Sequence, residues 1–171
     1  SNPVSVREYL DGLLLHIRSA VGSNTACIEV KAGQHLIVLD AGSGLCRLSQ
    51  ALMAGKCGQG KGTVHLFLSH LGWDHIQGFP FFTPAYVPGN RIIFYSPFAE
   101  MEQRLIEQQR PEHFPAALHG PYVRADKEFV QLKENQALVL DGLQVHHALL
   151  AHRSCSYRVE ADQTCLVYAP V

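Results

Sequence analysis

Several features that would place this chain in a common class are missing from its 171 residues. No apolar run approaches the ~20 residues of a membrane-spanning helix, so we expect no membrane association. Charged residues make up only 17%, and a net charge of −1 without a long basic run argues against general affinity for nucleic acid. The glycine-rich stretch 55–62 lacks the G-x-x-x-x-G-K-[ST] pattern of a phosphate-binding loop and predicts a flexible turn.

A paired pattern of cysteines is also missing. The five cysteines are an odd number without a C-x-x-C pair, which argues against a disulfide scaffold and against a cysteine-rich metal site. We expect reduced and mostly buried thiols, and hence a cytoplasmic protein. Only Cys155 is a candidate thiolate ligand, because it lies close in sequence to His152, a candidate ligand described below. The cysteines are Cys27, Cys46, Cys57, Cys155 and Cys165.

The length and the hydrophobic content of 47% predict a single domain over residues 1–171 with a core of its own. Residues 4–18 have a spacing compatible with a short amphipathic helix or an irregular strand. Alternating patterns predict strands at 26–31, 35–39, 64–68, 91–95, 129–132, 137–140, 143–151, 156–160 and 164–168. Helices are expected at 45–54 and from Ser96-Pro97 to about Gln109.

One short stretch, residues 69–82, concentrates the chemistry. His70, Asp74 and His75 lie within six residues, directly after the buried strand 64–68. Imidazole and carboxylate groups together suit zinc, iron or manganese. Residue types alone leave a second interpretation open, in which this is a polar loop whose histidines cap the next helix.

The order of residues in this stretch, S-H-L-G-W-D-H-I-Q-G-F-P-F-F, resembles the H-x-H-x-D-H signature of the metallo-β-lactamase superfamily. It is most similar to the phosphodiesterase-like branch, which reads H-x-H-W-D-H-I-Q-G-F-P-F-F. His70, Asp74 and His75 match motif positions, whereas Gly72 stands at the second histidine and supplies no donor atom. The resemblance implies an α/β fold, the αββα sandwich, with two stacked sheets and helices outside.

The same resemblance implies two further site residues. The segment Leu39-Asp40-Ala41-Gly42 matches the family's L-D-A-G, whose aspartate lies below the metals and orients a ligand. On the residues alone, Asp40 could instead cap the following helix. His152 resembles the next metal-binding histidine, although no Pro-Gly-Gly turn follows it. Residues 111–125 correspond to a segment that covers the metal cleft in relatives, or they form an ordinary surface connection.

The end of the sequence departs from the family pattern. Relatives read Y-A-T-D where this chain has Tyr168-Ala169-Pro170-Val171, and their aspartate bridges two metals. The family's last histidine and final strands would lie beyond Val171. The resemblance therefore predicts a sandwich that is incomplete at its C-terminal side, with an uncovered apolar face that a second copy of the chain would cover.

These residues predict a metal-dependent hydrolase with an eroded site, acting on a phosphodiester or another small molecule. Asp74 would be catalytic. The expected metal ligands are His70, Asp74, His75 and His152. They would bind a single ion of zinc, manganese or iron, or the site would bind no metal. The alternative is a non-catalytic relative that serves as a binding or oligomerisation module. A third hypothesis is that the sequence is a fragment of a longer hydrolase, which would explain the C-terminal losses but not Gly72.

Overall fold

The computed structural model describes residues 8–9, 12 and 23–170, except residue 162. The segment 4–18 lies largely outside these residues, so its predicted helix or irregular strand has no counterpart here. None of the helices in the described part is both long enough and apolar enough to cross a membrane.

The first sheet has five strands in sequence order. The first two strands form an antiparallel hairpin, and Gly33 in their turn has a positive φ of 56° that suits glycine. All later neighbours are parallel. The strands are β1 (Ile28–Ala32), β2 (His35–Leu39), β3 (Thr63–Phe67), β4 (Arg91–Ser96) and β5 (Asp126–Gln131).

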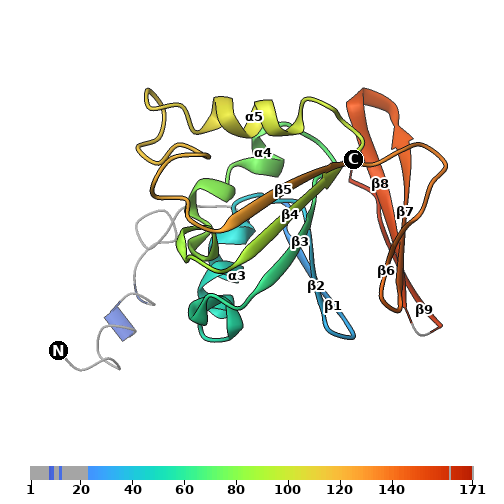
Figure 1. The fold of residues 1–171 in the computed structure, drawn as a ribbon, viewed down its shortest axis with the longest axis horizontal. Helices are drawn as coiled ribbons and strands as arrows, with labels where there is room; N and C mark the ends of the chain where they lie inside the picture. The colour runs from blue at the N-terminus through green and yellow to red at the C-terminus, as the bar shows by residue number, and fades with distance from the viewer. Residues whose placement is uncertain (1–7, 10–11, 13–22, 162, 171) are drawn as a thin grey trace.

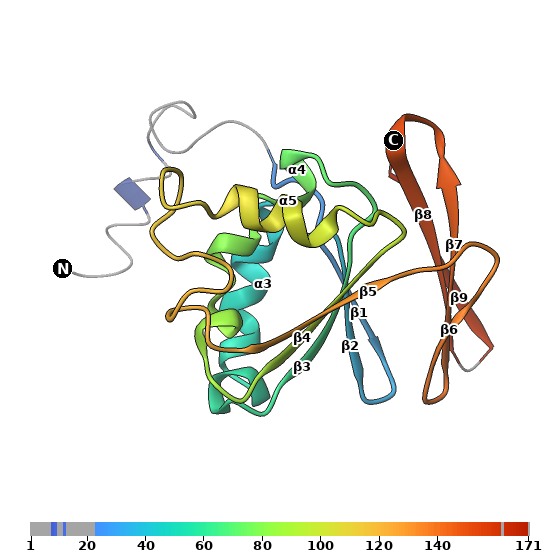
Figure 2. The same ribbon diagram turned by 45° about the horizontal axis from the view of Figure 1, so that its top comes forward.

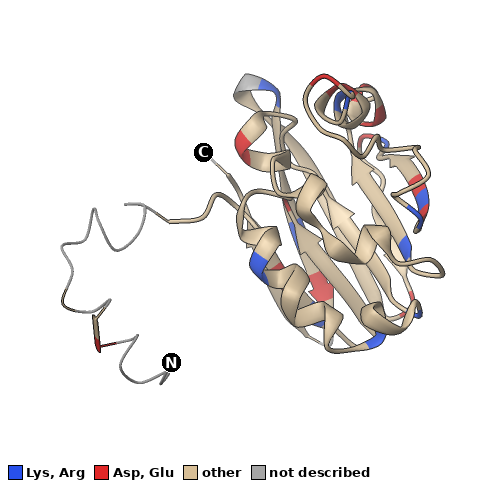
Figure 3. Cartoon of the chain, turned by 90° about the vertical axis from the view of Figure 1, so that its left-hand side faces the viewer, with Lys and Arg blue, Asp and Glu red and all other residues tan. Residues whose placement is uncertain are grey.

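Parallel neighbours require crossover connections, and helices supply them on one face of the sheet. These are α3 (Gly44–Met53), α4 (Trp73–Ile76) and α5 (Met101–Gln108). Two segments predicted as a turn and a loop contain short 3₁₀ helices, η1 (Lys56–Gln59) and η3 (Thr83–Tyr86), and a third 3₁₀ helix is η2 (Phe79–Phe81). Seen from the helical side, charged residues are few and scattered instead of forming one stripe (Figure 3).

The second sheet is a four-stranded antiparallel meander. Its strands are β6 (Leu138–Leu140), β7 (Leu143–Leu150), β8 (Ser154–Ala161) and β9 (Thr164–Tyr168), and the 3₁₀ helix η4 (Ala151–Arg153) joins β7 to β8. All four were predicted from alternation; β9 has the predicted bounds, and the ends of the other three differ by one or two residues. This sheet stacks on the first, on the side away from the helices (Figures 1 and 2).

Alternation along the central strands separates two cores. On β3, Val64 and Leu66 face the helical layer, whereas Phe67 faces the second sheet. The second core lies between the sheets and includes Tyr157, which is fully buried and donates a hydrogen bond to the carbonyl of Leu68. The stacked sheets confirm the predicted sandwich, and within the described residues no helix covers the outer face of the second sheet.

Two predicted starts are displaced by three residues or more. The strand predicted at 129–132 begins at Asp126. The second displaced start is that of α5. Ser96 was expected to start a helix, but it is the last residue of β4 and α5 begins at Met101. The Ser96 hydroxyl is buried and donates to the carbonyl of Leu68, 3.0 Å away, so it ties β4 to the end of β3 and does not cap a helix.

Candidate metal site

Three loops meet at the carboxyl ends of β2 and β3, where the motif lies. Backbone hydrogen bonds of 2.8 Å join them: the Ala41 amide donates to His75, the Gly78 amide to Ala41, and the Gly42 amide to Ala26. The side-chain amide of Gln77 adds a bond of 2.9 Å to the hydroxyl of Thr25. These bonds tie the part of the motif from His75 to Gly78 to the loop that follows β2 and to the segment that precedes β1.

Two glycines make this close approach possible. A Cβ on Gly42 would lie 2.5 Å from the Ala26 carbonyl oxygen and 2.6 Å from that of Asp74. A Cβ on Gly78 would lie 2.1 Å from the Gly42 carbonyl oxygen. All of these distances are below ordinary van der Waals contact, so the glycines of the motif and of the Asp40 loop allow the loops to pack against each other.

Asp40 is the buried centre of the site. It follows β2 with a positive φ of 62° and has no solvent exposure. Its carboxylate accepts hydrogen bonds from the Ser69 amide (2.8 Å) and hydroxyl (2.5 Å), from His75 Nδ1 (2.7 Å) and from the Tyr168 hydroxyl (2.6 Å). Four donors compensate the desolvation of this buried charge.

The bond to Asp40 fixes the orientation of His75. Because a carboxylate only accepts, His75 Nδ1 carries the proton, and in the neutral ring Nε2 keeps a free lone pair. That nitrogen lies 3.5 Å from Asp74 Oδ2. The hydrogen bond to Asp40 raises the pKa of His75, and burial opposes this shift. This is the geometry expected of a metal-binding imidazole with a carboxylate beneath it.

His70 takes a different arrangement because residue 72 is glycine. The Gly72 amide donates to His70 Nδ1 over 2.9 Å, so this nitrogen is an acceptor and not a proton carrier. A Cβ on Gly72 would lie only 2.5 Å from the same atom. The His70 ring thus occupies space that any side chain at position 72 would need.

The three motif residues come together. One ligand atom from each of His70, Asp74 and His75 lies within 4.8 Å of the other two, the only such group of His, Cys, Asp and Glu in the described part of the chain. Two imidazoles and a carboxylate suit a divalent cation. The capping interpretation fails, because helix α4 has no side-chain cap.

The side chain of His152 lies outside the described residues, so its role stays a prediction. The backbone beside it reaches the site, since the Cys155 amide donates to the Ser69 carbonyl over 2.8 Å. Cys155 is fully buried between the sheets, and burial raises the pKa of its thiol to about 12. Its thiol is not part of the group of ligand atoms at the motif, so Cys155 is not a candidate ligand.

A depression opens beside the cluster. It is lined by His70, Leu71, Gly72, Phe98, Glu100, Arg104 and Arg153. Arg153 has a positive φ of 57° and pairs with Glu100, and Arg104 lies 3.3 Å from Glu107. No residue of the segment 111–125 lines this depression; Ala116, Leu118 and Val123 of that segment are buried in the helical core instead.

Sequence reasoning missed two partners of Asp40. Ser69 directly precedes His70 and was read only as part of a polar cluster, although its position between strand and ligand was a usable signal. Tyr168 is 128 residues from Asp40, and no local pattern indicates that contact.

The sequence matches no protein-family model and no curated protein. Solved structures do match its fold. The metallo-β-lactamase fold protein YhfI from Bacillus subtilis aligns with a TM-score of 0.57 and 15% identity, covering 87% of this chain and 55% of that one. The subclass B3 metallo-β-lactamase MEM-A1, from a soil metagenome library, gives 0.54 and 17%, covering 85% and 56%.

A third structure, metallo-β-lactamase SMB-1 bound to 2-mercaptoethanesulfonate, gives a TM-score of 0.54 and 13% identity, covering 86% of this chain and 58% of that one. Identities this low establish the fold alone. The chain therefore has the metallo-β-lactamase fold predicted from its motif, and it spans a little over half the length of these proteins.

Proposed function

We propose that this metallo-β-lactamase fold is a metal-dependent hydrolase that uses one divalent cation held by His70, Asp74 and His75. The observation that supports it is the convergence of their ligand atoms within 4.8 Å. The Asp40 bond adds to it by directing the free nitrogen of His75 toward Asp74. Zinc is the cation this donor set favours, with manganese and iron as alternatives, and His152 is the fourth donor that we propose.

Asp40 and Asp74 have different roles in the proposed reaction. A bound cation would supply Lewis acidity and a water nucleophile of lowered pKa. Asp40 holds His75 in its binding tautomer and is not itself available, because its oxygens already accept four hydrogen bonds. Asp74 has a side chain 63% exposed, so we assign it the catalytic role of orienting water and accepting its proton.

The substrate we propose is anionic, of the phosphodiester type. Arg104 and Arg153 line the same depression as His70, and guanidinium groups bind phosphate oxygens through paired hydrogen bonds. Leu71 and Phe98 provide apolar surface beside them. Glu100 and Glu107 would have to share their arginines with the substrate.

A non-catalytic binding module is the second candidate, and one observation favours it. His70 Nδ1 accepts a hydrogen bond from the Gly72 amide, so in the neutral ring the lone pair is engaged and Nε2 carries the proton. A cation must break this bond or bind after His70 turns, which weakens binding. The free state of all five cysteines accords with the reducing cytoplasm, the location that we propose.

Metal content and hydrolysis, measured on the same protein, separate these functions. We expect about one equivalent of zinc after loading and removal of excess, together with hydrolysis of bis(p-nitrophenyl) phosphate. His75→Gln should abolish both. The control His119→Gln replaces an exposed histidine paired with Glu102 and should change neither. Bound zinc without hydrolysis, or no bound zinc at all, overturns the hydrolase and supports the non-catalytic module.

A further inference from the structure

A second pocket lies at the opposite end of the first sheet from the motif. It surrounds the start of β3, whereas the motif follows the end of β3, so a strand length of roughly 15 Å separates them. Its volume of about 580 Å³ is in the range of small-molecule sites. The lining comes from the β1–β2 turn, α3, the glycine-rich loop 55–62 and the first residues of β3 and β4.

The charged residues that line this pocket are all basic. Lys31, Lys56, Lys61 and Arg91 line it, and no aspartate or glutamate does. The chain has 14 basic and 15 acidic residues, so an even distribution would bring both signs to a lining of this size. Such a pocket attracts anions even though the protein as a whole is nearly neutral.

Two of these cations have no ion-pair partner among the residues that the structure describes. Lys31 pairs with Glu29 and Arg91 with Glu128, but Lys56 and Lys61 make no ion pair within the described residues. The amide of Lys61 donates to the carbonyl of Lys56 over 3.0 Å, which brings the backbones of the two lysines together at the rim of one pocket. An anion between them would relieve the repulsion of their like charges.

The loop that presents these lysines is closely packed. A Cβ on Gly58 would lie 2.1 Å from the Met53 carbonyl oxygen, and one on Gly60 would lie 2.3 Å from that of Pro88. The buried side chain of Asn90 accepts from the Gly62 amide and donates to the Cys57 carbonyl, each over 2.8 Å. The glycines serve this packing, so both lysines start from a defined backbone.

A histidine on β3 adds a polar group to the lining of this pocket. His65 is 6% exposed and lines the pocket from β3. Its Nδ1 bonds to the Tyr95 hydroxyl over 3.0 Å, and its Nε2 has no hydrogen-bond partner within the described part of the chain. Nε2 is not among the buried side-chain atoms of the described residues that lack a partner, so it is accessible from the pocket and can hydrogen-bond a polar group of a ligand there.

We propose that this basic pocket binds a small phosphorylated molecule. Lys56 and Lys61 contact the phosphate, His65 Nε2 contacts a polar group of the ligand, and the organic part packs on Leu52 and Ile93 of the lining. The site is separate from the metal cluster, and its existence does not depend on hydrolase activity.

Titration with pyrophosphate, followed by amide NMR on metal-free protein, tests the site. We expect saturable shifts confined to residues 31–36 and 55–65, at physiological ionic strength. The double variant Lys56→Gln/Lys61→Gln should bind at least tenfold more weakly, which corresponds to about 1.4 kcal/mol. Both lysines are exposed, so the fold should be retained.

A charge-matched control is Arg47→Gln/Lys133→Gln, which removes two exposed positive charges elsewhere and should bind like the wild type. Equal weakening in both double variants would show diffuse electrostatic attraction and would overturn the site. Shifts centred on residues 70–75, or no saturable shifts, would do the same. None of these results depends on whether zinc binds or a phosphodiester is hydrolysed.

Discussion

Because residue 72 is glycine, the ring of His70 can lie against the backbone amide of that residue. With φ −70° and ψ 157°, the backbone conformation of Gly72 is one that any residue adopts, and the three atoms nearest to a new Cβ belong to the side chains of His70 and Asp74. A side chain at this position would therefore push the His70 ring away from the Gly72 amide without moving backbone.

We predict that Gly72→His binds zinc at least tenfold more tightly than the wild type, a gain of about 1.4 kcal/mol, because it adds a donor and releases His70 Nδ1. Competition with a chromogenic chelator measures the affinity. Gly72→Ala is the matched control, since it displaces the same ring without supplying a ligand. Equal affinities for the two variants would refute the placement of residue 72 beside the cation.

His65 lies away from the metal cluster, and it makes the free energy of unfolding depend on pH. Burial lowers its pKa from 6.5 to about 4, with His35 and Arg91 adding to the shift and Glu128 opposing it. Below pH 6.5 the unfolded chain takes up a proton that the folded chain refuses, so stability falls as pH drops from 6.5 to 4. The loss is about 3 kcal/mol at most.

Urea unfolding at several pH values checks this prediction. His65→Phe keeps a flat ring beside Tyr95 but cannot titrate, so its stability should decline less between pH 6.5 and 4. His146→Gln, at a half-exposed position, should keep the wild-type slope. If the free energy of unfolding of His65→Phe fell with pH as steeply as that of the wild type, His65 would not be the titrating group.

At the scale of elements, the packing of three loops depends on Gly42. We predict that Gly42→Ala lowers the free energy of unfolding by about 1–3 kcal/mol, because the methyl group would meet backbone oxygens of Ala26 and Asp74 that cannot rotate away. Zinc affinity should fall with it, since the Asp74 backbone must shift. Gly55→Ala is the control, because its Cβ would meet nothing closer than 3.6 Å.

A melting temperature of Gly42→Ala equal to that of Gly55→Ala would rule out this close contact. The expected difference is several degrees, at roughly 2–4 °C per kcal/mol for a chain of this size.

Local sequence patterns predicted most helices and strands, but not the contacts between residues that are far apart in the sequence. The strand 35–39 was predicted to the residue from its alternation, and the helix 45–54 within one residue, because one face of each is apolar. The start of α5 was missed because Ser96 makes its hydrogen bond across the sheet, to a residue 28 positions away. Likewise, the Asp40–His75 relation followed from a motif resemblance, whereas the Asp40–Tyr168 bond depends on how the two sheets stack.

At the scale of the molecule, the four sheet edges differ in how they are protected. Edge strand β1 carries Glu29 and Lys31, and β5 carries Asp126, Lys127 and Glu128; such charges discourage pairing with another chain. β6 has only three residues. β9, Thr164–Tyr168, has no charged residue, and four of its five residues are exposed.

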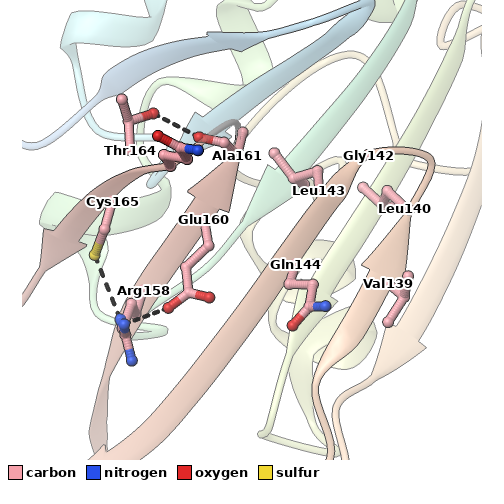
Figure 4. A pocket seen from close by; sticks show the side chains of 11 residues that line it. Val139, Leu140, Gly142, Leu143, Gln144, Arg158, Glu160, Ala161, Thr164 and Cys165 are labelled. Carbon is pink, nitrogen blue, oxygen red and sulfur yellow. Dashed lines mark hydrogen bonds and ion pairs between the residues drawn. The ribbon is translucent and has the colours of Figure 1, made fainter.

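The outer face beside β9 is mixed in character. Arg158 lies between Cys165 and Glu160 there, close to both (Figure 4). Val139 and Val167 are exposed on the same face, 68% and 63% respectively. Because polar groups interrupt the apolar surface, the uncharged edge of β9 is the stronger candidate for association than the face itself.

We predict a dimer in which two β9 edges pair antiparallel about a two-fold axis and join the two four-stranded sheets. Light scattering coupled to size exclusion, with a reductant because Cys165 is exposed, should show the mass approaching twice that of the chain as the concentration rises through the micromolar range. Val167→Glu adds a charge to the edge and should give a monomer, whereas Val139→Glu on β6 should not. A wild-type monomer at every concentration would exclude self-pairing and leave β9 open to a strand from another partner.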